Sequence, residues 1–178
     1  GLLLTFFLSC LLYYIFLIDD AETINLLKFF VIASFLNLIL NLLPSKNKFK
    51  VFSGDSGSLF IGFFISFMTI ELYNSFYIHP VILIWPLWYP VYDFLFVSIN
   101  RLSNKKSIFK PDNTHLHHII YNKFRGNKIL PIILFLLVNT SIIFFGYKIS
   151  EISKLLSLCI FITGFTFYFV MRLFVLKK

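Results

Sequence analysis

The sequence predicts an all-α protein, a polytopic transmembrane helical bundle with about six spans. Of its 178 residues, 58% are hydrophobic and 25 are Phe, and the mean hydropathy is +0.85. Soluble domains are about 45–50% apolar, so this composition excludes an ordinary soluble fold. The apolar residues also gather in stretches long enough to cross about 30 Å of hydrocarbon as helices.

The expected spans cover roughly residues 2–18, 24–43, 59–75, 81–99, 129–147 and 154–171. The chain begins Gly1-Leu2-Leu3, without Met or a basic flank, which is not the pattern of a signal peptide. We therefore interpret residues 1–178 as the C-terminal part of a single membrane domain whose N-terminal part is missing. Cys10 and Cys159 fall inside spans and are expected to be small apolar filler.

The basic residues predict the orientation of the chain. Thirteen of the 16 Lys and Arg residues lie in loops 44–58 and 100–128 or in the C-terminal tail. The positive-inside rule places these segments and both termini in the cytoplasm. The net charge of +8 then follows from topology and from contact with anionic lipid, so no nucleic-acid partner is expected.

Three of the eight acidic residues lie on the cytoplasmic half of this topology: Asp55, Asp93 and Asp112. The other five fall near the outer loops and are interpreted as ordinary solvated residues. Among them, the paired carboxylates Asp19 and Asp20 resemble a metal-binding dyad. They lie on the outer face of the predicted topology, however, away from the other polar motifs.

Segment 54–58 holds two glycines, two serines and Asp55. Its glycines can adopt positive φ and let a ligand approach the backbone. Ser56 or Ser58 is expected to cap a helix that starts near Leu59, where free N–H groups form an anion site. A carboxylate beside a phosphate needs a bridging cation, which favours Mg²⁺. The alternative is an N-capping turn with a solvated Asp.

The residues before this segment have the side chains that a nucleotide would need. A base could stack on Phe52, the amide of Asn41 could read its edge, and the cations could meet its phosphates. Pro44 ends the preceding helix. The basic run consists of Lys46, Lys48 and Lys50. Taken singly, these lysines are equally typical of a snorkelling positive-inside loop.

A histidine cluster follows the fourth span. A short helix is expected from His115 to about Lys123, with His115 and His118 on one face and His117 pointing elsewhere. The histidines could bind zinc, but Asp112 is the only nearby carboxylate. Phosphate binding or proton transfer is the favoured interpretation. Four cations that could meet a diphosphate precede the cluster: Arg101, Lys105, Lys106 and Lys110.

The fourth span carries Asp93 together with Pro86 and Pro90, which are expected to kink its helix. A carboxylate inside a span costs about 2.5–3.5 kcal/mol on insertion scales, so Asp93 should face a cavity or a partner. Two interpretations stay open here. The helix could border a groove open to lipid, or Asp93 could form a buried hydrogen bond that fixes helix packing.

These residues carry a family resemblance. The chain resembles the C-terminal half of the bacterial polyprenyl-phosphate N-acetylhexosamine-1-phosphate transferases, the WecA-like enzymes related to MraY in the glycosyltransferase 4 family. Residues 51–59, VFSGDSGSL, match the family pattern VFMGDxGSLxLG, with Ser53 in place of Met. Pro90 and Asp93 are followed by Arg101, and residues 107–118, SIFKPDNTHLHH, match SPFxPDxxHxHH.

The resemblance implies a reaction in which a polyprenyl phosphate attacks the β-phosphate of a UDP-sugar and releases UMP. It would be the first membrane step of cell-envelope polysaccharide synthesis, catalysed by cytoplasmic loops of a multi-pass protein in the bacterial inner membrane. N-acetylglucosamine is the default sugar. The pathway and the formation of a homodimer stay open.

The resemblance also implies roles for single residues. Asp55 would bind Mg²⁺, or Mn²⁺ as an alternative, and would act in catalysis together with His115, His117 and His118. The implied substrate-binding residues, of which two hold the uridine, are Asn41, Phe52, Gly54, Ser58, Asp93, Arg101 and Asp112.

The family's paired-Asp motif and Asn-rich Asp-Gly motif are missing, so the 178-residue chain alone is expected to be inactive.

Two rival functions are a transporter or flippase that uses Asp93 and the kinked helix, and a non-catalytic membrane scaffold.

Overall fold

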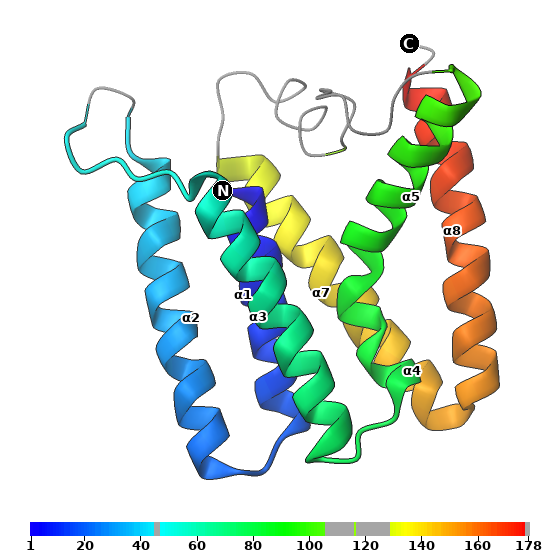
Figure 1. The fold of residues 1–178 in the computed structure, drawn as a ribbon, viewed down its shortest axis with the longest axis horizontal. Helices are drawn as coiled ribbons and strands as arrows, with labels where there is room; N and C mark the ends of the chain where they lie inside the picture. Colours follow the sequence, from blue (N-terminus) through cyan, green and yellow to red (C-terminus); the bar gives the residue numbers. More distant parts are fainter. Residues whose placement is uncertain (45–46, 106–115, 117–128, 177–178) are drawn as a thin grey trace.

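The computed structural model describes residues 1–44, 47–105, 116 and 129–176, and every regular element among them is a helix. The expected all-α bundle is thereby confirmed (Figure 1). The elements are α1 (Leu2–Leu17), α2 (Ala21–Leu42), α3 (Gly54–Asn74), α4 (Pro80–Leu83), the 3₁₀ turn η1 (Trp85–Leu87), α5 (Trp88–Ser103), α7 (Ile129–Ile152) and α8 (Lys154–Leu176).

The helices run up and down, with α4, η1 and α5 making one pass. The α2–α3 loop, the last turns of α5 and α8 and the first turn of α7 lie at one end of the bundle, here named the loop end (Figure 1). The connections α1–α2, α3–α4 and α7–α8 lie at the other end. The helices on either side of segment 106–128, α5 and α7, therefore end and begin at the same end of the bundle as the α2–α3 loop, as the charge pattern predicts.

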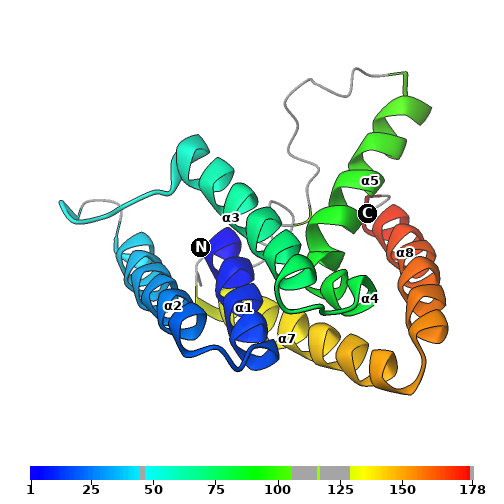
Figure 2. The ribbon, with the colours of Figure 1, turned by 60° about the horizontal axis from the view of Figure 1, so that its bottom comes forward.

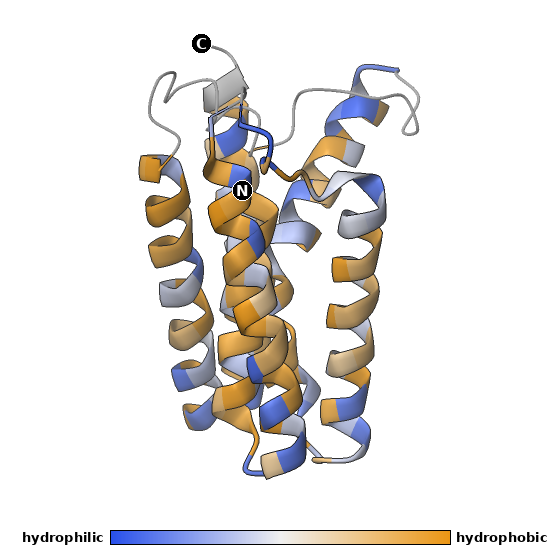
Figure 3. Cartoon of the chain, turned by 90° about the vertical axis from the view of Figure 1, so that its left-hand side faces the viewer, coloured by the Kyte–Doolittle hydropathy of each residue, from blue (hydrophilic) through white to orange (hydrophobic). Residues whose placement is uncertain are grey.

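Five helical segments are long and apolar enough to span a membrane, namely Ala21–Leu42, Gly54–Asn74, Pro80–Ser103, Ile129–Ile152 and Lys154–Phe174. Apolar residues make up most of their length (Figure 3). The chain is a multi-pass membrane protein. The remaining expected span, residues 2–18, is the shorter α1, which packs between α2, α3 and α7 (Figure 2). Its Cys10, Leu11 and Tyr14 are fully buried, so α1 forms the centre of the bundle.

The start of α3 differs from the prediction. The helix begins at Gly54 rather than near Leu59, and Ser53 is its N-cap without a side-chain capping bond. The expected capping by Ser56 or Ser58 is therefore wrong, since both lie inside the helix. Gly54 has a φ of 59°, which turns the chain into the helix at a conformation that a residue without Cβ adopts easily. No Pro or β-branched residue in 55–58 opposes the first turn.

The fourth pass is broken, as its prolines predict. It is helical over α4, tightens to a 3₁₀ turn at Trp85–Leu87 and continues as α5. Pro86 lacks an N–H group, so the regular hydrogen bonding cannot continue through it. Pro90 lies in the first turn of α5, where a missing N–H is tolerated.

Buried polar side chains connect the passes. The Asn139 amide on α7 donates to the Ser9 hydroxyl on α1 and accepts from the Trp88 indole N–H at 2.6 Å. The Trp85 indole N–H donates to the Ser157 hydroxyl on α8 at 2.8 Å. Inside a membrane these donors find no water, so the hydrogen bonds select one arrangement of the helices that carry the loop end.

Asn139→Leu is expected to destabilise the fold by about 1–3 kcal/mol, because it leaves the buried Trp88 N–H without its acceptor. Thermal unfolding of the full-length protein in detergent would measure this as a lower Tm. Thr140→Val is the matched control, since the Thr140 hydroxyl only donates to the Leu136 carbonyl of its own helix. Equal Tm values for the two variants would contradict the role assigned to Asn139.

Candidate functional site

Asn41 holds the α2–α3 loop to the end of α2. Its Nδ2 atom donates to the Val51 carbonyl oxygen at 3.0 Å. Within the loop, the Phe49 backbone N–H donates to the Asn47 side-chain oxygen at 2.8 Å. The amide of Asn41 thus positions the loop, while its predicted contact with a base stays a prediction.

Phe52 presents an aromatic ring beside this anchor. It is 70% exposed, and the ammonium group of Lys50 lies 4.9 Å from its ring centroid. A large exposed ring at the loop end, next to a cation, has the shape and charge to stack against a base and meet a phosphate.

Asp55 is exposed in the first turn of α3. The preceding Gly54 borders open space, since nothing lies within 4 Å of the position a Cβ would take there. Backbone N–H groups at a helix start attract anions. Ser58 donates its hydroxyl hydrogen to the Asp55 carbonyl oxygen at 2.7 Å, which stabilises this turn. The first turn of α3 therefore combines a carboxylate, an anion-binding backbone and free space.

The chemistry of this turn fits Mg²⁺. The ion usually takes one or two carboxylates and fills its other positions with water and substrate phosphate oxygens. Asp55 could supply one such carboxylate. Within the part of the chain that the structure describes, no group of three or more His, Cys, Asp or Glu side chains gathers as a complete protein-built site.

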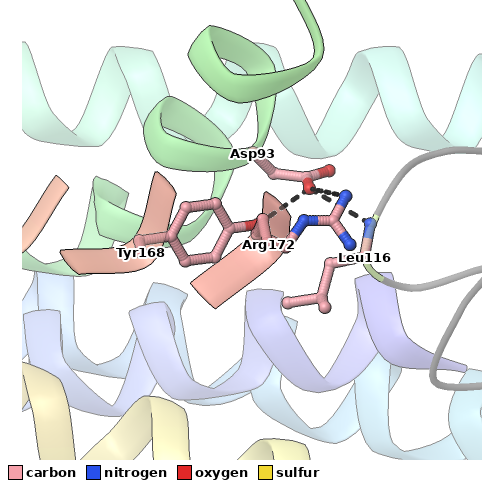
Figure 4. Close-up of polar contacts among 4 residues, drawn as sticks. All are labelled: Asp93, Leu116, Tyr168 and Arg172. Atoms are coloured by element: carbon pink, nitrogen blue, oxygen red, sulfur yellow. Dashed lines mark hydrogen bonds and ion pairs between the residues drawn. The ribbon is translucent and has the colours of Figure 1, made fainter. Parts of the chain in front are cut away.

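A second polar centre lies inside the bundle, around Asp93 (Figure 4). Asp93 is only 4% exposed. Its Oδ1 atom accepts from the Tyr168 hydroxyl at 2.9 Å, from the Leu116 backbone N–H at 3.1 Å and from the Arg172 guanidinium at 3.4 Å. Arg172 is 2% exposed, and its guanidinium carbon lies 4.8 Å from the Phe96 ring centroid.

Asp93 is thus buried and hydrogen-bonded, as the interpretation of a buried hydrogen bond that fixes helix packing requires. A contact with substrate stays a prediction. Sequence analysis missed Arg172, which it counted among the charges of the cytoplasmic tail. The available signal was its place in an apolar helix between Met171 and Leu173, because a cation at such a position needs a buried partner.

Arg101 lies two turns beyond Asp93 on the same face of α5 and is buried at 8% exposure. Its contact with a diphosphate stays a prediction. The predicted site residues Asp112, His115, His117 and His118 lie outside the described residues, as does the helix expected up to about Lys123, except that Leu116 is helical.

Both residues of the outer acidic pair, Asp19 and Asp20, are exposed, and Asp20 also has a structural role. Asp20 is the N-cap of α2 and accepts from the Thr23 backbone N–H at 2.8 Å. Hydrogen bonds from Thr23 hold the pKa of Asp20 below its usual range. The pair lies at the end opposite to the loop end, in the α1–α2 connection.

Comparison with known proteins found several that are similar to this chain. A Bacillus subtilis protein, named as a probable undecaprenyl-phosphate N-acetylglucosaminyl 1-phosphate transferase, is 40% identical over 95 residues, 52% of this chain and 25% of the relative. The chain is similar to undecaprenyl-phosphate N-acetylglucosaminyl 1-phosphate transferases.

Two further similar proteins are each named undecaprenyl-phosphate alpha-N-acetylglucosaminyl 1-phosphate transferase. The one from Yersinia pestis is 29% identical over 137 residues, 74% of this chain and 37% of the relative. The one from Escherichia coli K12 is 34% identical over 105 residues, 57% of this chain and 29% of the relative. The chain therefore spans only about a quarter to a third of the length of these transferases. No family model and no solved structure matches it.

Proposed function

We propose that this chain forms part of a membrane transferase that moves a HexNAc-1-phosphate group from a UDP-sugar to undecaprenyl phosphate and releases UMP. The observation that carries the proposal is the exposed Asp55 in the first turn of α3, beside the open space at Gly54. The names of the similar proteins support undecaprenyl phosphate as the acceptor and N-acetylglucosamine as the default sugar.

In this reaction an oxygen of undecaprenyl phosphate attacks the β-phosphorus of the UDP-sugar. The bond between that phosphorus and the bridging oxygen breaks, and UMP leaves with the bond's electrons. Asp55 and the N–H groups of the first turn of α3 would hold the diphosphate in line for this attack. Mg²⁺, or Mn²⁺, when bound, supplies positive charge against the phosphate oxygens.

The α2–α3 loop would hold the uridine. Phe52 offers its exposed ring for stacking, Asn41 keeps the loop in place, and Lys50 adds a cation near the phosphates. Arg101, Asp112 and the three histidines would contact the diphosphate or the sugar from segment 101–118. The excess of Lys and Arg in the loop-end segments supports a cytoplasmic position of this end in the bacterial inner membrane.

UMP release tests the proposal directly. The full-length protein encoded by the gene, in detergent or nanodiscs, would receive undecaprenyl phosphate, UDP-N-acetylglucosamine and Mg²⁺. We expect UMP only when lipid and metal are both present, and none from the 178-residue chain alone. Release with a different UDP-HexNAc would change the assigned sugar. No UMP with any UDP-HexNAc would contradict the proposal and favour the transporter or scaffold.

Phe52→Ala is expected to raise KM for the UDP-sugar about tenfold and to leave kcat nearly unchanged, since stacking of a base on an aromatic ring contributes about 1–3 kcal/mol. Phe49→Ala is the matched control, because Phe49 is 75% exposed in the same loop and its ring has no described contact with a cation. Steady-state kinetics of UMP release measure both. Equal changes of KM in the two variants would show that Phe52 has no specific contact with the uridine.

A further inference from the structure

We infer that Asp93 is a positioning residue: together with Arg172 and Tyr168, it holds the backbone N–H of Leu116, the residue between His115 and His117 in the sequence. This inference rests on the proposed function, because it assigns a role to Asp93 in that reaction. It differs from the contact with substrate that the sequence suggests for Asp93.

The geometry joins three separate parts of the chain at one oxygen atom. Asp93 Oδ1, on α5, accepts from the Tyr168 hydroxyl and the Arg172 guanidinium, both on α8, and from the Leu116 N–H (Figure 4). Leu116 stands between His115 and His117 in the sequence. A hydrogen bond to the main chain of Leu116 therefore fixes the chain at the position between these two histidines.

Charge makes this restraint strong. Arg172 forms an ion pair with Asp93 in which both side chains are almost completely buried. An N–H group bonds more strongly to a charged acceptor than to a neutral one. The Phe96 and Tyr168 rings lie 4.8 and 6.0 Å from the guanidinium carbon and limit its movement. Arg172 thus keeps a charged, oriented acceptor in place for Leu116.

Packing of α5 against α8 does not by itself account for the Leu116 bond. The same two helices are also joined beside this cluster by the Tyr92 hydroxyl, which donates to the Phe161 carbonyl, and by contact of the Tyr92 and Phe165 rings. The Trp85–Ser157 hydrogen bond adds a further link between the fourth pass and α8. The Asp93 cluster differs from these contacts because it also binds a residue outside both helices.

Positioning matters for the proposed transfer because the histidines would meet phosphate or sugar groups. A displacement of about 1 Å in a catalytic group can lower the rate about 100-fold while binding changes little. Loss of the restraint should therefore lower kcat much more than it changes KM.

The test uses the full-length protein in nanodiscs with Asp93→Leu, which removes the acceptor, and Asp93→Asn, which keeps an oxygen but removes the charge. Ser157→Ala is the matched control, since it removes a buried hydrogen bond to the same pass at the other end of α8. Two quantities are measured: amide hydrogen exchange of the peptide that contains Leu116, and kcat and KM for UMP release.

We expect Asp93→Leu to speed exchange of that peptide at least about tenfold, because hydrogen bonds to charged groups contribute about 1.5–3 kcal/mol. We expect kcat to fall about 100-fold, with KM for the UDP-sugar changed less than about threefold. Asp93→Asn should show smaller changes in the same direction, and Ser157→Ala should change neither quantity more than about twofold.

Three outcomes would contradict the inference. Exchange could stay the same in both Asp93 variants, KM could rise in place of a fall in kcat, or Ser157→Ala could produce changes as large as those of Asp93→Leu. The second outcome would assign Asp93 to substrate binding. The third would show that the cluster of Asp93, Arg172 and Tyr168 serves only the packing of the helices. If the wild-type protein releases no UMP, the proposed function fails, whereas the exchange experiment still decides whether Asp93 holds Leu116.

Discussion

Asp55→Asn in the full-length protein is expected to lower kcat for UMP release about 1000-fold, which is the loss typical of removing one essential electrostatic contact from a transition state. The substitution keeps the size of the side chain and removes its charge. Asp55 is exposed in the first turn of α3, so the change affects no core packing. A neutral amide is a poor ligand for a divalent cation beside a diphosphate.

Glu71→Gln is the matched control, because it makes the same change of carboxylate to amide near the opposite end of the same helix. There the Glu71 carboxylate accepts from the Ser75 hydroxyl at 2.6 Å. We expect Glu71→Gln to retain activity within about twofold and both variants to keep the wild-type Tm, as surface substitutions usually do. If Asp55→Asn also kept wild-type kcat at saturating Mg²⁺, the assignment of Asp55 as the metal ligand would be wrong.

Gly146→Ala is expected to destabilise the bundle by about 3 kcal/mol, at the upper end of the range for overpacking a core. A methyl group at Gly146 on α7 would overlap the Trp85 indole. The indole cannot easily move aside, since its N–H donates to Ser157 and its ring packs edge-on against Phe161 at 5.4 Å. Small residues at helix contacts in membranes allow this kind of close approach.

Gly62→Ala controls for the helix propensity of the added methyl group. Gly62 lies inside α3, and nothing approaches within 4 Å of the position a Cβ would take. We expect its Tm to equal or slightly exceed that of the wild type, because Ala favours a helix by about 1 kcal/mol over Gly. Thermal unfolding of the full-length protein in detergent compares the two variants. Equal effects would show that the Gly146–Trp85 contact does not limit packing.

Local chemistry accounts for what could be predicted of the fold. Long apolar stretches must form helices in a membrane because their backbone groups need internal partners, so the all-α class and the spans follow from hydropathy. The start of α3 was misplaced because the serines and glycines of 54–58 are typical of both a capping turn and a first helical turn. The segment is a first helical turn, as the positive φ of Gly54 and the main-chain hydrogen bond from Gly57 N–H to the Ser53 carbonyl show.

The features of the candidate site also divide into those that the sequence could predict and those that it could not. Motif spacing in the sequence was sufficient to single out Asp55, Phe52 and Asn41, because they lie close together along the chain. The role of Asn41 in holding the Val51 carbonyl could not be read from spacing, since it depends on Val51 lying beside the end of α2.

By itself, the sequence determined that this is a multi-pass helical membrane protein. It also predicted that the two polar segments, 51–59 and 107–118, belong to the same side of the membrane. Hydropathy and alternating passes require this, whatever the packing. Only the tertiary structure decided that α1 is central and that Arg172 is the partner of Asp93. These two residues are 79 positions apart, and such pairing depends on which helix faces meet. The physical reason is that a buried charge takes its partner from a neighbouring helix, and hydropathy along one helix does not identify that neighbour.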